Sequence, residues 1–336
     1  MEKIIRTICI FTDEITNREM KRFEEISTLL ERKGFSIQTK RFCLSGYKPA
    51  NDKELFNKGI LLGLGEQTFE ELKGNFTDFM KSENKDINLD LTNENITIEH
   101  AEVLFRIIES KPDNTFRFTY GFNLPVSSPF FPSAKFGQKG FGIGLQATNL
   151  SVNCNRLAGW LEKMKNVWEE VDSLISPIEG FLGIDSSIAP LYKGHGSLVN
   201  FVKRLGLDFS HSVTTDIYTT ISKYIQEHNP KPVGLCGLMF PCLEDFELAD
   251  EYEKGKFNIE RNIFLSLHCG LGIDTYPIAI NQNKERVVEI LRLLRQLSNK
   301  YKKPLSARFV SDGKAKIGEK TDFKNQYLKD AVVREL

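Results

Sequence analysis

The stretch VGLCGLMFPCLEDFELAD, residues 233–250, decides the fold that this sequence predicts. It is an apolar run punctuated by glycines, it ends in a proline turn, and the adjacent acids Glu244 and Asp245 follow at once. A short apolar run of this kind is typical of a buried strand. Acids directly after such a strand indicate a site where the strand surfaces, at the mouth of an α/β barrel.

Strand-like runs, Gly or Pro turns and amphipathic helices alternate along the whole chain. Strands separated by helices favour a mostly parallel sheet, and about eight to ten strands suit a closed barrel or a large open sheet. No linker divides the chain, which predicts a single domain over residues 1–336. Beyond the stretch above, strands are expected over 4–11, 35–44, 86–91, 116–122, 140–148, 180–185, 267–280 and 304–312.

Charge is balanced, with 45 basic and 45 acidic residues. Proteins that bind nucleic acid or membrane surfaces usually carry a basic excess, so neither partner is expected. The N-terminus lacks the apolar core and cleavage site of a signal peptide, and no run approaches the roughly 18 apolar residues of a membrane span. We therefore expect a cytoplasmic protein with a small-molecule ligand, and leave a homo-oligomer open.

Acidic residues follow three Gly-containing apolar runs, at Asp185, at the pair Glu244 and Asp245, and at Asp274. In parallel α/β folds the carboxyl ends of the strands form the ligand-binding rim. Acids there can bind a hard cation or act as general acid or base. For the Glu244 and Asp245 pair, capping of a helix start is an equal alternative. Asp185 lies in apolar surroundings, where a buried carboxylate needs partners.

Other candidate ligand-binding residues lie in loops. His195 stands in a Gly-flanked loop, and Lys314 lies in a basic loop after the last expected strand, near Arg308. Phe130 and Phe131 flank a proline turn and either fill the barrel end or line the pocket wall. A surface histidine and a solvated hairpin are the plain alternatives for the first two. The six cysteines lack CxxC pairing and indicate free, packed thiols.

Several short motifs occur in an order that resembles one family, the Domain of Unknown Function 711. They are PFFPSA (129–134), GFGIGLQA (140–147), GIDSSIAP (183–190), GLCGLMFPCLED (234–245), GLGIDTYPI (270–278) and ARFVSDGKAKIGEKTDF (307–323). The resemblance covers roughly residues 115–325. It implies an α/β barrel of about ten strands, similar to those of pyruvate formate-lyase and ribonucleotide reductase, and it implies no established activity.

The barrel of those two enzyme families holds a cysteine thiyl radical, but the glycyl-radical loop of pyruvate formate-lyase has no counterpart here. Arg308 and Gly313 lack the required spacing. The chain also departs from the family pattern at residues 186–188 and at Cys236. The residues that match the family motifs are Phe130, Phe131, Pro132, Asp185, Ala189, Pro190, Pro241, Glu244, Asp245, Asp274, Gly313 and Lys314.

The leading hypothesis is an enzyme of hydrolase or lyase type that acts on a small anionic metabolite at the barrel mouth. Lys314 and Arg308 would hold the anion, and His195, Phe130 and Phe131 would contact it. The expected catalytic residues are Asp185, Glu244, Asp245 and Asp274. A divalent cation is a candidate cofactor, with Asp185, Glu244 and Asp274 as its candidate ligands.

Two alternatives stand beside this hypothesis. The first is a non-catalytic metabolite-binding or regulatory protein that uses the same pocket. The second is a radical enzyme that uses Cys236 or Cys242, which the missing glycyl-radical loop disfavours.

Overall fold

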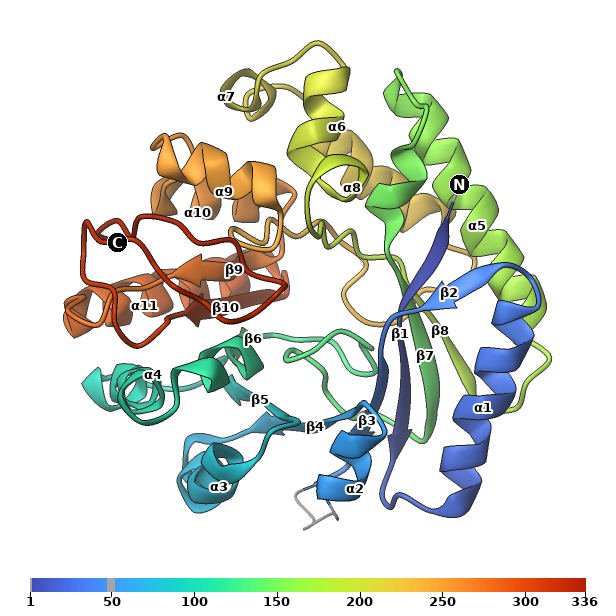
Figure 1. The fold of residues 1–336 in the computed structure, drawn as a ribbon, viewed down its shortest axis with the longest axis horizontal. Coiled ribbons are helices and arrows are strands. Elements are labelled where there is room, and N and C mark those ends of the chain that lie inside the picture. Colours follow the sequence, from blue (N-terminus) through green and yellow to red (C-terminus); the bar gives the residue numbers. More distant parts are fainter. Residues whose placement is uncertain (1, 47–51) are drawn as a thin grey trace.

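A ten-stranded sheet forms the centre of the chain in the computed structural model, which describes residues 2–46 and 52–336 (Figure 1). Its order is β8-β7-β1-β3-β4-β5-β6-β10-β9, with β2 paired to β1. The strands are β1 (Lys3–Thr12), β2 (Phe35–Ile37), β3 (Lys40–Leu44), β4 (Ile60–Gln67), β5 (Lys85–Asp90), β6 (Phe118–Phe122), β7 (Gly140–Leu145), β8 (Phe181–Asp185), β9 (Gly272–Pro277) and β10 (Leu305–Val310).

Helices connect most of these strands and lie around the outside of the sheet (Figure 1). Thr16 caps the first of them, and Thr68 and Glu71 form a capping box at the start of the third, as their side chains favour. The helices are α1 (Asn17–Glu31), α2 (Asp52–Asn57), α3 (Phe69–Lys81), α4 (Ile98–Ser110), α5 (Leu157–Ile175), α6 (Leu198–Arg204), α7 (Phe209–Ser212), α8 (Ile217–His228), α9 (Phe246–Glu253), α10 (Ile259–His268) and α11 (Lys284–Tyr301).

The sheet consists of two groups of strands that run in opposite directions. Strands β1 to β6 pair parallel with one another, and so do β7 with β8 and β9 with β10. The groups meet antiparallel at β1–β7 and at β6–β10. The expected mostly parallel sheet is confirmed. The carboxyl ends of the two groups point to opposite edges. The acids Asp185, Glu244 and Asp274 lie on or after β8, residues 233–241 and β9, which run in the same direction.

The stretch 233–241 is not the regular strand that its apolar sequence predicts. Gly234 and Cys236 adopt positive φ angles of 74° and 43°, which a continuous strand ladder does not accommodate. The stretch instead makes isolated parallel bridges to both edges of the sheet. These bridges are Ile184–Pro232, Ile188–Leu238, Leu238–Gly270 and Pro241–Asp274. The strand ladder itself therefore ends at β8 and β9.

The two faces of the sheet have different cores. On β1, Ile8 and Ile10 belong to the large apolar core shared with the helices, whereas Cys9 and Phe11 belong to a small cluster on the opposite, inner face. The loop from β6 to β7 packs on that inner face. A Cβ on Gly63 of β4 would lie 2.7 Å from the Phe131 ring, so the glycine admits the ring.

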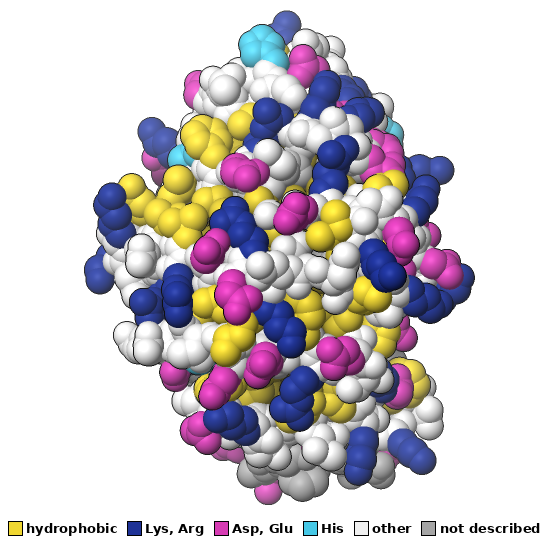
Figure 2. Space-filling view, turned by 90° about the vertical axis from the view of Figure 1, so that its left-hand side faces the viewer, with side chains coloured by type: hydrophobic (Ala, Val, Ile, Leu, Met, Phe, Trp, Pro, Cys, Tyr) yellow, Lys and Arg dark blue, Asp and Glu magenta, His cyan; other side chains and the backbone are white. Residues whose placement is uncertain are grey.

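The surface carries charges of both signs. On the face that Figure 2 shows, basic and acidic side chains alternate with hydrophobic ones, in keeping with the balanced composition. Among the described residues, every helix is too short or too polar to cross a bilayer.

Candidate functional site

A cavity of about 380 Å³ lies on the inner face of the sheet. Its charged lining consists of Arg6, Arg41, Arg117 and Arg308 together with Asp86, Glu244 and Asp274. Phe130 and Phe131 line it, as the sequence predicted for an aromatic pocket wall. Because the two groups of strands run in opposite directions, residues near the starts of β3, β5 and β6 line the same space as residues of β9 and β10.

Arg308 joins two of the predicted acids. Its Nε donates a hydrogen bond to Oδ1 of Asp274 at 2.5 Å, and its Nη2 donates to Oε1 of Glu244 at 2.9 Å. All three side chains are buried. Burial raises the pKa of Glu244, although Arg308 acts in the opposite sense. Burial alone would lower the pKa of Arg308, but Asp274 and Glu244 raise it. Glu244 and Asp274 therefore converge, and the guanidinium group of Arg308 binds both.

Arg41 and Asp86 are two further buried charges of the cavity lining, and among the described residues no hydrogen bond or ion pair joins them. Arg41 is 7% exposed, its Nε donates to Oγ1 of Thr39 at 3.2 Å, and its Cζ lies 4.7 Å from the centre of the Phe131 ring. Within residues 2–46 and 52–336, neither Nη1 of Arg41 nor Oδ2 of Asp86 has a hydrogen-bond partner. A buried polar group without a partner is costly, and a hydrogen bond with a bound molecule would offset that cost.

Burial shifts the pKa values of both Asp86 and Arg41. Burial raises the pKa of Asp86 from 3.8 to about 7, against the effect of Arg117 and Arg41. Burial also lowers the pKa of Arg41 to about 10, while Asp86 acts to raise it. At neutral pH, Arg41 is therefore protonated and Asp86 exists in both protonation states. A carboxyl group of this kind can both accept and donate a proton.

Two further arginines, Arg6 and Arg117, line the cavity, and they differ in the hydrogen bonds that they already make. Arg6 donates from Nη1 to Oε1 of Gln38 at 3.2 Å, and its Nη2 lies 3.8 Å from Oε2 of Glu244. Its Cζ also lies 5.9 Å from the ring centre of Tyr327, which the C-terminal segment brings to the cavity. Arg117 donates from Nη2 to the carbonyl oxygen of Ser82 at 2.8 Å, so one of its donor nitrogens is already hydrogen-bonded to the backbone.

Asp185 lies outside the described cavity lining and is fully buried. Its carboxylate accepts hydrogen bonds from the backbone N–H groups of Leu235 at 2.8 Å and Cys236 at 3.0 Å. The hydroxyls of Ser187 and Ser128 donate to it at 2.5 and 2.8 Å. Burial raises its pKa, and these donors oppose that effect. Asp185 thus has the partners that its burial requires, and they fix the stretch 233–241 against β8.

Asp245 takes the capping role that the sequence left open. It accepts hydrogen bonds from the backbone N–H of Leu248 at 3.2 Å, in the first turn of α9, and from that of Leu198 at 2.9 Å, at the start of α6. Burial raises its pKa to about 7. Asp245 is not among the described residues that line the cavity. Its bonds join two helix starts rather than contacting a ligand.

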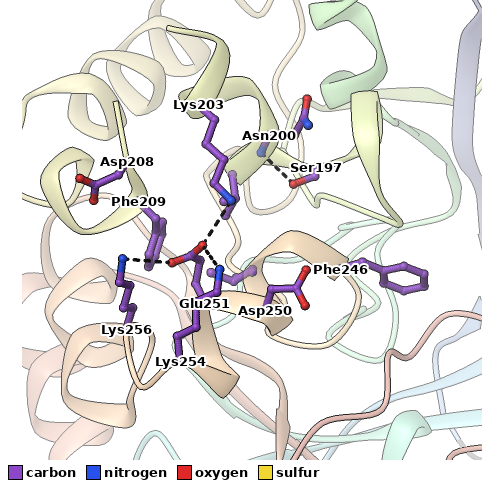
Figure 3. Close-up of polar contacts among 12 residues, drawn as sticks. Ser197, Asn200, Lys203, Asp208, Phe209, Phe246, Asp250, Glu251, Lys254 and Lys256 are labelled. Carbon is purple, nitrogen blue, oxygen red and sulfur yellow. Dashed lines mark hydrogen bonds and ion pairs between the residues drawn. The ribbon is translucent and has the colours of Figure 1, made fainter. Parts of the chain in front are cut away.

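A separate charged cluster holds the far end of α9 to α6. Glu251 accepts from Nζ of Lys203 at 3.2 Å and from Nζ of Lys254 at 3.1 Å, and Nζ of Lys256 lies 3.9 Å away (Figure 3). Burial alone would raise the pKa of Glu251, but the bonds to Lys254 and Lys203 lower it. None of these residues lines the described cavity. The cluster is an interhelical contact.

His195 and Lys314 are exposed and lie outside the described lining of the cavity. The backbone N–H of Lys314 donates to Oδ1 of Asp312 at 2.9 Å, which shapes the loop after β10. The three candidate metal ligands do not share the cavity, because Glu244 and Asp274 are in its described lining and Asp185 is not. In the described parts of the chain, no three His, Cys, Asp or Glu side chains gather as metal ligands.

The two cysteines of the radical alternative do not line the cavity, so far as the structure describes its lining. Burial raises the pKa of Cys236 to about 11 and that of Cys242 well above its ordinary value. Both are therefore thiols at neutral pH. Cys242 is fully buried in the main apolar core.

Sequence reasoning missed Arg6, Arg41 and Asp86. Each is a charged residue inside a strand, in IIRTICIF, KRFCL and DINLDL. A charge at an inward position of such a strand needs a partner or a polar cavity. That signal was present in the sequence. It did not say which of the charges would face each other, because strand direction and register set that.

A family model described as "Uncharacterised ACR (DUF711)" matches residues 82–325. The chain belongs to the DUF711 family. The predicted family is thereby confirmed, and the match begins earlier than residue 115, where the motif resemblance begins to be strong. It includes Asp86, Glu244, Asp274 and Arg308 of this DUF711 member. Arg6 and Arg41 precede the matched range.

One DUF711-like relative is a "UPF0210 protein" of Sulfurisphaera tokodaii, 22% identical over 232 residues. The match covers 61% of this chain and 52% of the relative, so the chain spans about half the length of the curated protein that it matches. Neither description names a reaction, a substrate or a cofactor.

Proposed function

We propose that this DUF711 member is an enzyme of hydrolase or lyase type that binds a small anionic metabolite in the inner cavity. One observation supports this most directly: Arg41 is buried, lines the cavity, and has an Nη1 atom without a partner in the described structure. A desolvated guanidinium binds a carboxylate or phosphate strongly and with defined geometry. Arg6 would be a second hydrogen-bond donor to the anion, since its Nη2 lies 3.8 Å from Oε2 of Glu244, which is too long for a hydrogen bond.

We further infer that the architecture is a closed barrel like that of pyruvate formate-lyase. The stretch 233–241 would take the place of a strand between β8 and β9, and its isolated bridges to both edges support this. With β2 off the main path, closure would give one group of β1, β3, β4, β5 and β6 and an opposed group of β7, β8, residues 233–241, β9 and β10. It would also separate the cavity from bulk water, which strengthens electrostatic interactions inside it.

In this proposal Asp86 transfers the proton. Its ionised form accepts a proton from the bound substrate, and the protonated form returns that proton to the leaving group. Arg41 neutralises the anionic end and fixes its position relative to Asp86. The Glu244–Arg308–Asp274 cluster keeps the opposite wall rigid, because each carboxylate already bonds the same guanidinium. Positioning of this kind is a large part of catalysis by proton transfer.

The first test is binding of simple anions. We expect sodium acetate, succinate or phosphate to raise the melting temperature of the wild-type protein relative to sodium chloride of equal ionic strength. Arg41→Met should lose this effect, whereas Lys40→Met on the same strand, whose side chain lies outside the described lining, should keep it. Failure of every anion to stabilise the wild type would refute the proposed site.

The second test separates an enzyme from a sensor. The wild-type protein and Asp86→Asn would each be incubated with a mixture of small carboxylic and phosphoric acid metabolites, followed by proton NMR. The enzyme hypothesis predicts that the wild type depletes one component and that Asp86→Asn slows this at least a hundredfold, as loss of a general acid–base commonly does. Stabilisation by an anion without any product would favour the sensor.

A further inference from the structure

We propose that the ligand of this cavity is a hydrophobic monocarboxylate, with one carboxylate on Arg41 and an aliphatic or aromatic body against the apolar wall beside it. This inference rests on the proposed anion site and names its substrate class. It draws on three observations: the immediate neighbours of Arg41, the residues that complete the wall, and the charge of the lining.

Two apolar side chains lie beside Arg41, in addition to Thr39, which accepts a hydrogen bond from its Nε. In the parallel pairing of β3 and β4, Arg41 is directly opposite Leu61, and both line the cavity. Residue 63, two positions further along β4, is glycine, and the Phe131 ring occupies the space that its side chain would fill. The same ring lies 4.7 Å from Cζ of Arg41. A carboxylate bonded to Arg41 therefore continues into a space bounded by a leucine and an aromatic ring.

The stretch 233–241 and the loop from β6 to β7 complete this wall. Leu235, Met239 and Leu271 line the cavity, and so does Phe130. Methionine and aromatic side chains adapt to ligands of irregular shape. Pockets for small molecules commonly combine such a wall with a few placed polar groups. A volume of about 380 Å³ falls in the range of those pockets.

The charge of the described lining favours a single negative charge. Four arginines and three carboxylates leave an excess of one positive charge when all are ionised. The charge of Arg308 is more than balanced by Glu244 and Asp274, and one bond of Arg117 goes to Ser82. A second carboxylate on the ligand would have to compete with Gln38 and Glu244 for Arg6, or lie against apolar side chains, where burial of an unpaired charge is costly. A hydrophilic dianion is thus a poorer fit than a monocarboxylate of similar size.

The test is a titration series by calorimetry with sodium acetate, butyrate, hexanoate and 3-phenylpropionate, compared with succinate, phosphate and neutral hexanamide. We expect affinity to rise about fourfold for each added methylene between acetate and hexanoate. Hexanoate should bind at least tenfold more tightly than hexanamide and than succinate. Arg41→Met should abolish the difference between hexanoate and hexanamide, and the control Lys40→Met should preserve it.

A second variant keeps the inference testable if Arg41→Met does not fold. Leu61→Ala removes apolar contact beside the guanidinium and should cut the gain from butyrate to hexanoate at least threefold, with acetate binding unchanged. Tighter binding of succinate or phosphate than of hexanoate would overturn the monocarboxylate inference and leave the anion site standing. Absence of binding by all of these anions would remove the proposed function as well.

Discussion

Arg308 is the residue on which two buried carboxylates depend. It donates to Asp274 and to Glu244, and each of the three side chains is less than a tenth exposed. Removing one partner from a buried ion cluster leaves unpaired charge in a medium that solvates it poorly. The sequence analysis assigned Arg308 to the ligand; in the structure its donors are already in use.

We expect Arg308→Met to lower the free energy of unfolding by about 3–5 kcal/mol. The loss should be larger at pH 8 than at pH 5, because protonation of the stranded acids relieves part of it at low pH. Urea denaturation at both pH values measures it. Arg286→Met, which breaks an exposed pair with Glu289, is the control and should cost about 1 kcal/mol or less. Equal losses for the two variants would contradict the buried cluster.

Asp86 should make stability depend on pH. Burial raises its pKa from 3.8 to about 7, so between these values the unfolded chain releases a proton that the folded chain keeps. The contribution of this group to stability is fully present below about pH 4 and is lost as the pH rises to 7. We expect the stability of Asp86→Asn relative to wild type to rise by about 1 kcal/mol per pH unit across this window. Parallel pH profiles by urea denaturation would disprove it.

At the scale of elements, glycines in the strands make room for the loop from β6 to β7. On β7, a Cβ at Gly144 would lie 2.7 Å from the Phe130 ring, and on β4 the same holds for Gly63 and Phe131. Both rings line the cavity. Gly144 of GFGIGLQA therefore has a packing function, and the strand predicted over 140–148 despite its three glycines is observed as β7.

We expect Gly144→Ala to cost about 1–3 kcal/mol, because the added methyl forces Phe130 to move in a filled space. Gly74→Ala in the exposed middle of α3 is the matched control, since a Cβ there meets nothing within 4 Å. That change should stabilise the protein by up to about 1 kcal/mol. Thermal unfolding of both variants tests the pair. Similar effects of the two substitutions would show that Phe130 is loosely held.

At the scale of the whole molecule, the stretch 233–241 links the two edges of the sheet. Backbone hydrogen bonds join it to Ile184 and Ile188, and between these the carboxylate of Asp185 accepts the backbone N–H groups of Leu235 and Cys236. The positive φ angles of Gly234 and Cys236 turn those two N–H groups out of a regular ladder. A buried acid is therefore needed where strand pairing is interrupted.

Asp185→Asn keeps the shape of the side chain but turns one acceptor oxygen into a donor that faces other donors. We expect it to lower the free energy of unfolding by about 3 kcal/mol. Hydrogen exchange at the amides of Leu235 and Cys236 should become at least tenfold faster, as mass spectrometry can follow. Asp172→Asn on α5, whose partner is the exposed Ser176, is the control and should change little. Unchanged exchange at both amides would contradict this role.

The sequence by itself determined the family, most of the strands and helices, and the burial of Asp185. Those follow from local pattern: alternation of apolar residues, glycine and proline turns, and acids in apolar surroundings. The sequence also contains the charged residues Arg6, Arg41 and Asp86 within strands, although the sequence analysis did not use them.

Only the tertiary structure decided which charges meet. Glu244 and Asp274 converge on Arg308, Asp245 caps α9 and Asp185 holds a backbone turn, although all four acids follow similar apolar runs. The physical reason is that strand direction and register fix which side chains share a cavity, and contacts between segments far apart in the chain set both. Local pattern fixes where a charge lies along a strand, and the packed sheet fixes what it faces.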